Sequence, residues 1–329
     1  MLTHSTPLRA AQTATRRAAR SDLCVRAMAS GSASEAQAPV AVTKELKNAG
    51  PEPKRFTVAN GQLITIASAA FAGLARFGSG GFAVGYKTEF VDAAAEAGKY
   101  SVMTTGSRAV KETSRVDTFK RPVKPIELYE FQGCPSAGRC GGSQVREAIS
   151  ILDLDVTVYP TPRNGKVWRP KAVELGGKAQ FPYLVDNNTG EQMYESDAII
   201  SYLFNEYGDG QVPLGLRLGA ATTITCGLAL APRVGKGSRA KPSRQPAEPL
   251  VMWGYELSPF VVVVKETLSE LELPYKQVTC SRGSPKRQQL LEKRGHFQVP
   301  YLEDPNTGVY LFESAAINKY LEDTYALPA

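Results

Sequence analysis

An internal repeat constrains the fold of this chain more than any other feature of its sequence. Residues 182–207 read PYLVDNNTGEQMYESDAIISYLFNEY, and residues 300–325 read PYLEDPNTGVYLFESAAINKYLEDTY. At an offset of 118 positions, 14 of these 26 positions are identical. Identity at this level is far above chance, which indicates that one folding unit occurs twice in the chain.

The similarity extends upstream and predicts the elements of each copy. IELYEF (126–131) corresponds to LVMWGY (250–255), and such short apolar runs are typical of buried strands. VREAISILDL (145–154) corresponds to VKETLSELEL (264–273), in which apolar residues recur at helical spacing. A second strand, a loop ending at a proline, two strands around an Asn-Thr-Gly turn and a last helix follow, and Ser196 is the expected N-cap of that helix. Each copy is therefore predicted to fold as β-α-β-α-β-β-α.

This order, with its motifs, resembles the branch of the thioredoxin-like superfamily that holds glutaredoxins and glutathione transferase N-terminal domains. The matching motifs are Cys-Pro or Ser-Pro after the first strand, an apolar residue and proline before the third, and Glu-Ser at the last helix. The chain as a whole resembles plastid proteins of plants and algae with two such domains in tandem. We therefore expect an α/β protein with two tandem thioredoxin-like domains and a helical or irregular N-terminal extension.

The expected domain boundaries follow from the repeat and from the composition. They are a transit peptide over 1–34, an extension with an apolar helix over 35–124, the first domain over 125–210, a linker with an apolar segment over 211–249, and the second domain over 250–329.

The first 34 residues have the composition of an organelle transit peptide. They are rich in Ala, Ser and Thr and hold five Arg but only one acidic residue, Asp22. Val25-Arg26-Ala27 resembles a chloroplast cleavage context, so residues 1–27 predict import into the plastid. This segment accounts for +4 of the net charge of +7. The remainder has no basic block that would indicate a nucleic-acid groove.

The resemblance implies a cysteine at the start of the first helix of each domain, where the helix dipole lowers the thiol pKa. The second copy reads Ser258-Pro259, and a serine cannot carry out thiol–disulfide exchange. A serine can still bind a glutathione thiolate, as some glutathione transferases do. We therefore expect the second copy to be a degenerate, redox-inactive site.

The first copy keeps Cys134-Pro135 but carries a five-residue Gly/Ser-rich insertion before the helix. Cys134 keeps the position next to the strand, whereas Cys140 lies closer to the expected helix. Either cysteine is a candidate nucleophile, and a third possibility is that the insertion leaves neither active.

The resemblance also implies a glutathione site in each copy. Phe181-Pro182 and Val299-Pro300 occupy the place of a cis-proline, whose preceding backbone pairs with the cysteinyl backbone of glutathione. Glu195-Ser196 and Glu313-Ser314 lie at a helix N-terminus, which suits the γ-glutamyl group. Lys286 stands where omega-class transferases bind the glycine carboxylate. The alternatives are plain turn prolines, simple helix caps and a solvated lysine.

Other sites are not indicated by the sequence. With two His in the chain and no CxxC pair, no metal site is expected. The apolar segments 63–85 and 218–231 are expected to pack on the domains or to lie at a membrane surface, because Arg76 interrupts the first and the second is short.

Three functions remain open at this stage. The first is a glutathione-dependent thiol–disulfide oxidoreductase, with glutathione as co-substrate and a thiol or disulfide protein as partner. The second is a non-catalytic binding or assembly module in which the two domains pack as a pseudo-dimer. The third and weakest is a conjugating glutathione transferase, which normally requires a large all-helical domain after the first copy.

Overall fold

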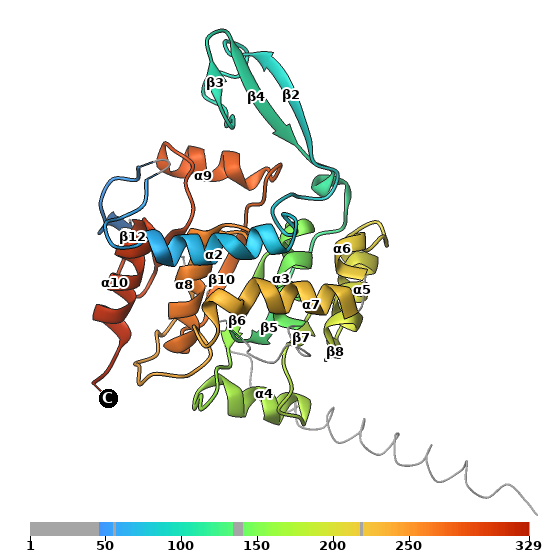
Figure 1. The fold of residues 1–329 in the computed structure, drawn as a ribbon, viewed down its shortest axis with the longest axis vertical. Helices are drawn as coiled ribbons and strands as arrows, with labels where there is room; N and C mark the ends of the chain where they lie inside the picture. The colour runs from blue at the N-terminus through green and yellow to red at the C-terminus, as the bar shows by residue number, and fades with distance from the viewer. Residues whose placement is uncertain (1–45, 55–56, 134–140, 218–219, 329) are drawn as a thin grey trace, which may run out of the picture. The chain divides into compact units, whose positions relative to one another are not determined.

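The computed structural model describes residues 46–54, 57–133, 141–217 and 220–328, and these residues belong to one compact unit, Lys44–Ala329. Both copies of the repeat have the predicted order of elements (Figure 1). The first half contains β5 (Ile126–Glu130), α3 (Gly141–Ile151), β6 (Val156–Pro160), α4 (Trp168–Gly176), β7 (Tyr183–Asp186), β8 (Glu191–Met193) and α5 (Ser196–Tyr207).

The second half repeats this order. It contains β9 (Leu250–Gly254), α8 (Pro259–Glu270), β10 (Tyr275–Thr279), α9 (Lys286–Arg294), β11 (Tyr301–Asp304), β12 (Val309–Phe312) and α10 (Ser314–Tyr325). The predicted α/β class with two thioredoxin-like domains is confirmed. One detail of the prediction is wrong: α5 begins at Ser196 itself, so Glu195 occupies the N-cap position, without a capping hydrogen bond from its side chain.

The two halves share one sheet of nine strands, in the order β1-β12-β11-β9-β10-β6-β5-β7-β8. They meet where β6 pairs antiparallel with β10. Thr157 lies opposite Lys276, and these two residues occupy the same place in the two copies. The register is therefore symmetric about this pair, and each half covers the strand edge that the other would expose.

Helices cover both faces of this sheet. On one face, α3, α5, α8 and α10 cover a single continuous core to which both halves contribute. In β5, Ile126 and Leu128 point into this core, whereas Tyr129 belongs to a separate cluster under α4. The corresponding cluster in the second half includes Trp253 and Leu290 of α9. This alternation is the two-residue period of a strand buried on both faces.

Buried charges also join the halves. Arg146 of α3 pairs with Glu130 of the first half and, at 2.8 Å, with Glu256 of the second. Lys265 of α8 lies 3.0 Å from the same Glu256. Two cations and two carboxylates thus balance one another, as burial of charge requires.

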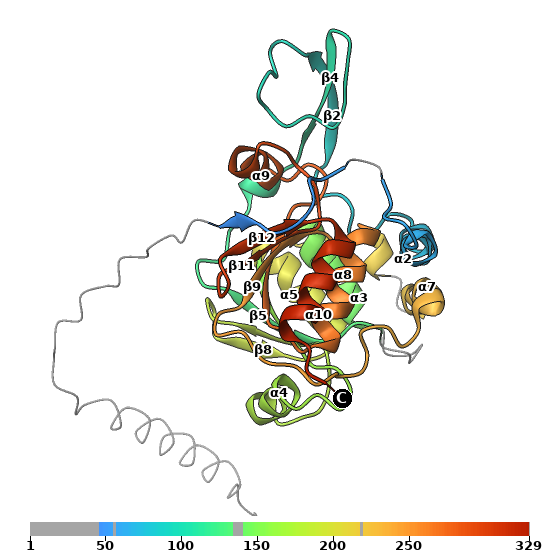
Figure 2. The same ribbon diagram turned by 90° about the vertical axis from the view of Figure 1, so that its left-hand side faces the viewer.

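The N-terminal extension contains more structure than its sequence predicts. The expected apolar helix is present as α2 (Leu63–Ala75). The extension also supplies β1 (Lys47–Asn48), η1 (Val116–Thr118) and a separate antiparallel sheet of β2 (Lys87–Asp92), β3 (Thr104–Thr105) and β4 (Arg108–Thr113). Between the halves lie α6 (Leu214–Arg217), α7 (Ala220–Leu230) and η2 (Ala231–Arg233), and Figure 2 shows α2 and α7 outside the helices that cover the sheet.

The most strongly repeated residues form a hydrogen-bond network in each half. In the second half, the Asp304 carboxylate accepts hydrogen bonds from the Tyr320 and Tyr325 hydroxyls at 2.7 and 2.6 Å and from Asn306. Asp186 has the same partners in the first half, namely Tyr202, Tyr207 and Asn188. The repeated motif from the Asp-x-Asn turn to the last helix is thus structural, because it fixes that helix on the sheet.

This network generates a stability prediction. Burial alone would raise the pKa of Asp304, but the hydrogen bonds from Tyr325, Tyr320 and Asn306 hold that pKa below its usual value. A lowered folded pKa stabilises the protein above the unfolded value of about 3.9, and this contribution disappears as the pH falls through the folded pKa. We expect Asp304→Asn to lower the free energy of unfolding by about 2 kcal/mol at neutral pH, measured by urea denaturation.

The matched control is Asp323→Asn, which removes an exposed carboxylate of the same half that pairs only with Lys319. It should change the unfolding free energy by less than about 0.5 kcal/mol. The proposed role of Asp304 would be contradicted if both substitutions changed the unfolding free energy equally. It would also be contradicted if the difference in unfolding free energy between wild type and Asp304→Asn stayed constant down to acid pH.

Candidate functional site in the second half

Equivalent backbone geometry marks the predicted site residues in both halves. The Phe181–Pro182 and Val299–Pro300 bonds are both cis, as the sequence predicts. Glu195 and Glu313 have positive φ values of 68° and 67°, which non-glycine residues rarely adopt. Such strained conformations cluster at binding sites, where the surrounding structure holds them.

Each of these glutamates is held by the glutamine that precedes the apolar-proline pair. Gln298 donates to the Glu313 carboxylate at 2.7 Å, and Gln180 donates to Glu195 at 2.5 Å. In the second half, the backbone N–H of Lys54 from the extension also donates to Glu313, at 2.9 Å. The carboxylates therefore stand at fixed positions at the start of α10 and α5.

The first half brings its predicted residues together at the start of α3. A methyl group added at Gly141 would lie 2.8 Å from the Ser196 Cβ and 3.3 Å from the Pro182 Cδ. Because Gly141 has no side chain, α3 approaches the cis-proline and the start of α5 closely. Cys134 and Cys140 lie outside the described residues, so the prediction that one of them is the nucleophile stays untested.

In the second half the corresponding residues line a cavity of about 250 Å³. Four of the predicted residues lie in its wall: Val299, Pro300, Glu313 and Ser314. The other residues of the second half that line it are Tyr255, Phe260, Arg282, Arg287, Phe297 and Gln298. The extension completes the wall with Lys54, Thr57, Tyr100, Ser101 and Val102.

Arg287, at the start of α9, is the principal cation of this cavity, and the sequence did not single it out. Its Nε donates to the carbonyl oxygens of Cys280 and Ser281 at 3.1 and 2.9 Å, and its Nη1 donates to the Tyr100 hydroxyl at 2.5 Å. Among the described residues of the cavity wall, Nη2 is the one buried side-chain nitrogen or oxygen atom without a hydrogen-bond partner. A buried donor without a partner is costly, which makes it a place where a ligand acceptor is stabilising.

Aromatic rings surround this guanidinium on several sides. Its carbon lies 4.7 Å from the centre of the Phe297 ring and 5.4 Å from those of Tyr100 and Tyr255. Ring faces attract a cation and exclude water from it. The arginine is thus fixed in its charged form in an apolar setting.

The first half repeats this arrangement with Arg169. Its Nη1 donates to the carbonyl oxygens of Thr161 and Pro162, which correspond to Cys280 and Ser281. Its guanidinium lies 4.8 Å from the centre of the Phe181 ring. The signal was available in the sequence, because Arg169 and Arg287 are identical residues at the repeat offset of 118.

The second cation of the cavity, Arg282, is anchored by the extension. Its Nε donates to Glu112 of β4 at 2.5 Å, and the Tyr86 hydroxyl donates to the same carboxylate at 2.7 Å. Burial and the contact with Glu112 raise the pKa of Tyr86 to about 12. Arg287 lies 3.4 Å from Glu112. One carboxylate thus faces two guanidinium groups, which leaves this end of the cavity positively charged.

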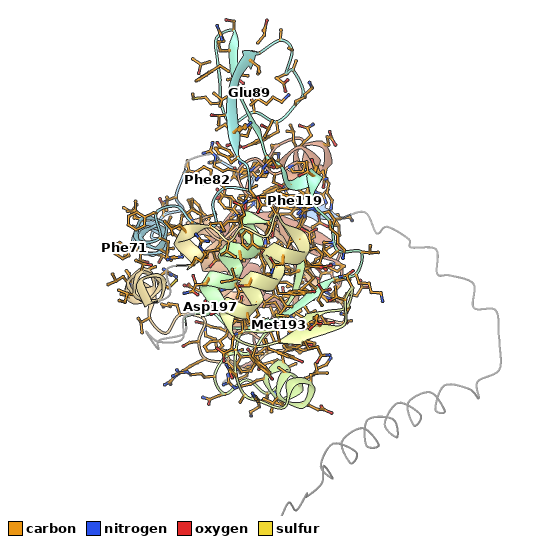
Figure 3. All side chains as sticks on the ribbon, turned by 90° about the vertical axis from the view of Figure 1, so that its right-hand side faces the viewer. Phe71, Phe82, Glu89, Phe119, Met193 and Asp197 are labelled. Carbon is orange, nitrogen blue, oxygen red and sulfur yellow. The ribbon has the colours of Figure 1, made fainter. Side chains whose placement is uncertain are left out.

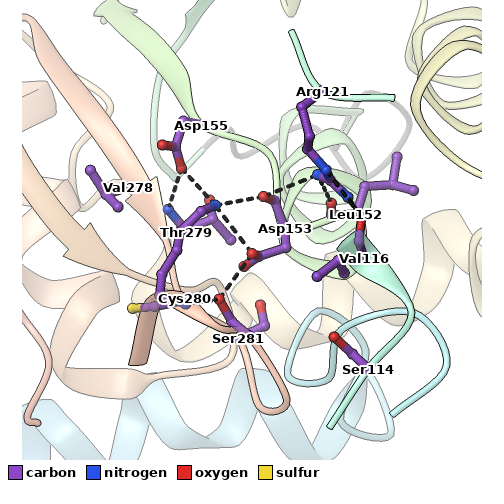
Figure 4. Close-up of polar contacts among 12 residues, drawn as sticks. Ser114, Val116, Arg121, Leu152, Asp153, Asp155, Val278, Thr279, Cys280 and Ser281 are labelled. Carbon is purple, nitrogen blue, oxygen red and sulfur yellow. Dashed lines mark hydrogen bonds and ion pairs between the residues drawn. The ribbon is translucent and has the colours of Figure 1, made fainter. Parts of the chain in front are cut away.

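Lys286 does not line the cavity. Its ammonium donates to the Asp153 carbonyl oxygen at 2.6 Å and to the Asp155 carboxylate at 2.8 Å, both in the first half. Figure 4 shows these aspartates beside Thr279, at the junction of the halves. The geometry gives Lys286 a role in joining the halves, and the cation in the cavity is its neighbour Arg287. The predicted contact of Lys286 with a glycine carboxylate has no support in this arrangement.

Ser258 is the N-cap residue of α8, but it is not among the residues that line the cavity. Phe260, on the first turn of α8, occupies the wall instead. At the position of the reactive cysteine the second half therefore has the Ser258 hydroxyl, and the ring of Phe260, two residues further on, lines the cavity.

The described cysteines, Cys226 and Cys280, are both buried. Burial raises the pKa of Cys280 to about 12, so its thiol is protonated at neutral pH and is a poor nucleophile. Within the described parts of the chain, no group of three or more His, Cys, Asp or Glu side chains is placed to hold a metal ion.

The wall of the cavity therefore holds both an acidic side chain, Glu313, and basic ones, Arg282, Arg287 and Lys54. Glu313 and the N-terminus of α10 suit a group that carries both an ammonium and a carboxylate. Arg287 and Arg282 suit a second carboxylate. Val299 and Pro300, which precede β11, line the same cavity, so the arrangement can hold a short zwitterionic peptide.

Comparisons with known proteins give one family for both halves. Residues 128–211 and 252–329 match the family model "Glutathione S-transferase, N-terminal domain". Two regions of the chain are therefore similar to glutathione S-transferase N-terminal domains. They coincide with the two thioredoxin-like halves of the sheet.

The similarity to whole transferases is partial. The chain is 37% identical over 78 residues to glutathione S-transferase GstB of Escherichia coli strain K12, and this match covers 23% of the chain and 38% of the relative. The GstB of Escherichia coli O6:H1 gives the same values. The solved glutathione transferase BmGSTD1 of Bombyx mori is 31% identical over 31% of this chain and 45% of its own, with a TM-score of 0.22.

The state of the cysteines generates the second prediction. We expect Cys280 and Cys226 to resist alkylation in the folded protein at neutral pH, because both are buried and the pKa of Cys280 is about 12. Alkylation rates as a function of pH, mapped by peptide mass spectrometry, measure this directly. Rapid labelling of Cys280 near pH 7 would contradict its burial, whereas a thiol at 134 or 140 that titrates below about 7 would be the activated nucleophile.

Proposed function

We propose that this chain is a glutathione-binding protein whose second half binds the tripeptide without thiol chemistry. The observation that carries the proposal is the buried Arg287 in the second-half cavity, whose Nη2 has no partner among the described residues. The glycine carboxylate of glutathione supplies the missing acceptor. The γ-glutamyl end meets Glu313 and Ser314.

The charges of the cavity match those of glutathione. At neutral pH the tripeptide has two carboxylates and one ammonium group. Arg287 and Arg282 share only Glu112, so an incoming carboxylate neutralises an excess cation. Glu313 offers an acceptor for the ammonium, and its backbone conformation is already fixed before the ligand arrives. A preorganised site loses less entropy on binding.

The size of the cavity argues against a conjugating transferase. At about 250 Å³ it lies just below the range of roughly 300–1,000 Å³ typical of small-molecule sites. Tyr100, Ser101 and Val102 of the extension form part of its wall. A space of this size suits one small peptide better than a peptide together with a bulky electrophile.

For the first half we propose glutathione-dependent thiol–disulfide exchange through Cys134 or Cys140. The thiolate attacks the glutathione sulfur of a mixed disulfide, the S–S bond breaks, and the protein substrate leaves as a thiolate that takes up a proton. A second glutathione then attacks the resulting enzyme–glutathione disulfide and releases oxidised glutathione. The repeated arginine, Arg169, and the Gln180–Glu195 pair support this half as the second binding site.

Residues 1–27 would direct the protein to the plastid.

The binding proposal predicts a loss of affinity in one arginine variant. We expect Arg287→Gln to weaken binding of glutathione to the second half at least about tenfold, because the variant cannot pair with the glycine carboxylate through a charge-assisted bond. Isothermal titration calorimetry on the full chain measures the change. To isolate the second site, the reference protein and the Arg287→Gln variant both also carry Arg169→Gln in the first half.

The matched control is Arg294→Gln, on the same helix. Arg294 lies 3.9 Å from the centre of the Tyr310 ring and does not line the cavity. Its removal should leave the affinity unchanged. If Arg287→Gln binds glutathione like the control, the cavity is not the binding site and the proposal fails.

The catalytic proposal predicts that replacement of Cys134 and Cys140 by serine abolishes glutathione-dependent reduction of a mixed disulfide. Binding of glutathione to the second half should persist in this variant, which separates chemistry from binding. The single substitutions identify the nucleophile in a coupled assay that measures oxidised glutathione. Unchanged turnover of the double variant would eliminate the oxidoreductase and leave a binding module.

A further inference from the structure

The outermost layer of the structure, formed by α2 and α7, turns apolar side chains outward and polar side chains inward. A helix on the surface of a soluble protein normally turns apolar residues inward and polar residues outward. On α2 the exposed positions are all apolar, and they share one helical face: Leu63, Ile64, Ala67, Phe71 and Leu74. Ile64 is 84% exposed and Leu74 is 76% exposed.

The neighbouring helix continues this apolar surface. Among the described side chains of α7, the exposed ones are Ile224 (62%) and Leu228 (56%), which are one helical turn apart. Phe77 and Val234, which follow the two helices, are also exposed. Figure 3 shows Phe71 at the outer edge of the molecule, away from the sheet.

The polar side chains of this layer point inward and are paired. Arg76, after α2, pairs with Glu147 of α3 at 2.7 Å and donates to the Thr225 hydroxyl of α7 at 2.6 Å. Arg233, after α7, pairs with Glu266 of α8 and donates to the Ser68 hydroxyl of α2 at 2.7 Å.

These two sets of contacts are equivalent under the symmetry of the halves, since Glu147 and Glu266 occupy the same place in the repeat. Each arginine fixes the opposite helix as well as its own. The outward apolar faces are therefore held in place by buried ion pairs. They are a built feature of the fold and do not result from loose packing.

The chain segments that carry this surface are basic. Residues 62–86 and 213–241 contain no Asp or Glu, and in them the exposed cations include Arg217, Lys236 and Arg239. An apolar surface on segments whose own charges are all basic matches a bilayer whose headgroups are anionic. No helix of the described residues is long and apolar enough to cross a membrane.

We propose that α2 and α7 dock this protein on the surface of an anionic lipid bilayer. The two helices lie in the plane of the interface, with Ile64, Leu74, Ile224 and Leu228 among the acyl chains. The flanking cations contact the headgroups. The alternative occupant is a second copy of this chain, which this surface favours less because a two-fold contact would bring like charges together.

The test is flotation of the full chain with vesicles of phosphatidylcholine mixed with phosphatidylglycerol, compared with phosphatidylcholine alone. We expect binding to the mixed vesicles that weakens with added salt. The double variant Ile64→Glu/Leu74→Glu should lower the partition coefficient at least about hundredfold, because two large apolar side chains no longer leave water. A second double variant, Ile224→Glu/Leu228→Glu, should act alike and covers the case in which the first does not fold.

The matched control is Phe90→Glu/Val123→Glu, which adds the same charges at apolar residues that are 73% and 94% exposed outside this layer. It should bind vesicles like the wild type. Failure of the wild type to float, or equal floating of all variants, would overturn the proposal. The wild type could instead be a dimer that the Ile64→Glu/Leu74→Glu variant converts to a monomer, with no vesicle binding by either protein. That result would assign the surface to a second copy of the chain and would also overturn the proposal. Glutathione binding is measured in parallel, so failure here is distinguishable from failure of the proposed function.

Discussion

The antiparallel pairing of β6 with β10 is the constraint on which the rest of the structure depends. It places the two halves in one sheet and brings the helices α3, α5, α8 and α10 over one core. Arg146 and Lys265, which correspond in the repeat, then converge on Glu256. Strand hydrogen bonds, burial of apolar side chains and paired charges therefore all stabilise the junction between the two halves.

The sequence predicted each half well because the relevant signals are local. The apolar runs, the Asn-Thr-Gly turns and the helical stripe of Ile199, Leu203 and Tyr207 each determine an element within a few residues. The cis bonds at Pro182 and Pro300 followed from the resemblance to the thioredoxin-like superfamily. The β6–β10 pairing could not be predicted, because Val156 to Val158 would be equally compatible with an inner or an edge strand.

At the site, too, residues in local motifs could be predicted from the sequence, whereas residues brought together by the fold could not. Val299, Pro300, Glu313 and Ser314 were identified because their motifs resemble those of glutathione transferase N-terminal domains. Arg287 was missed in favour of Lys286, since both are basic and only the three-dimensional contacts show that one faces Asp153 and Asp155 while the other faces the cavity. The contributions of Tyr100 and Glu112 depend on segments far away in the chain, and no local pattern predicts them.

The symmetric register at Thr157 and Lys276 has a consequence for the history of the molecule. A strand edge that pairs with its own equivalent about a two-fold axis is the hallmark of an isologous dimer. A single-copy ancestor with this edge would have joined with an identical subunit in the same way. In this chain both copies lie on one polypeptide, and the second has Ser258 where the first keeps Cys134. The asymmetry between Phe260 and Gly141 records that divergence within a frame that is still symmetric.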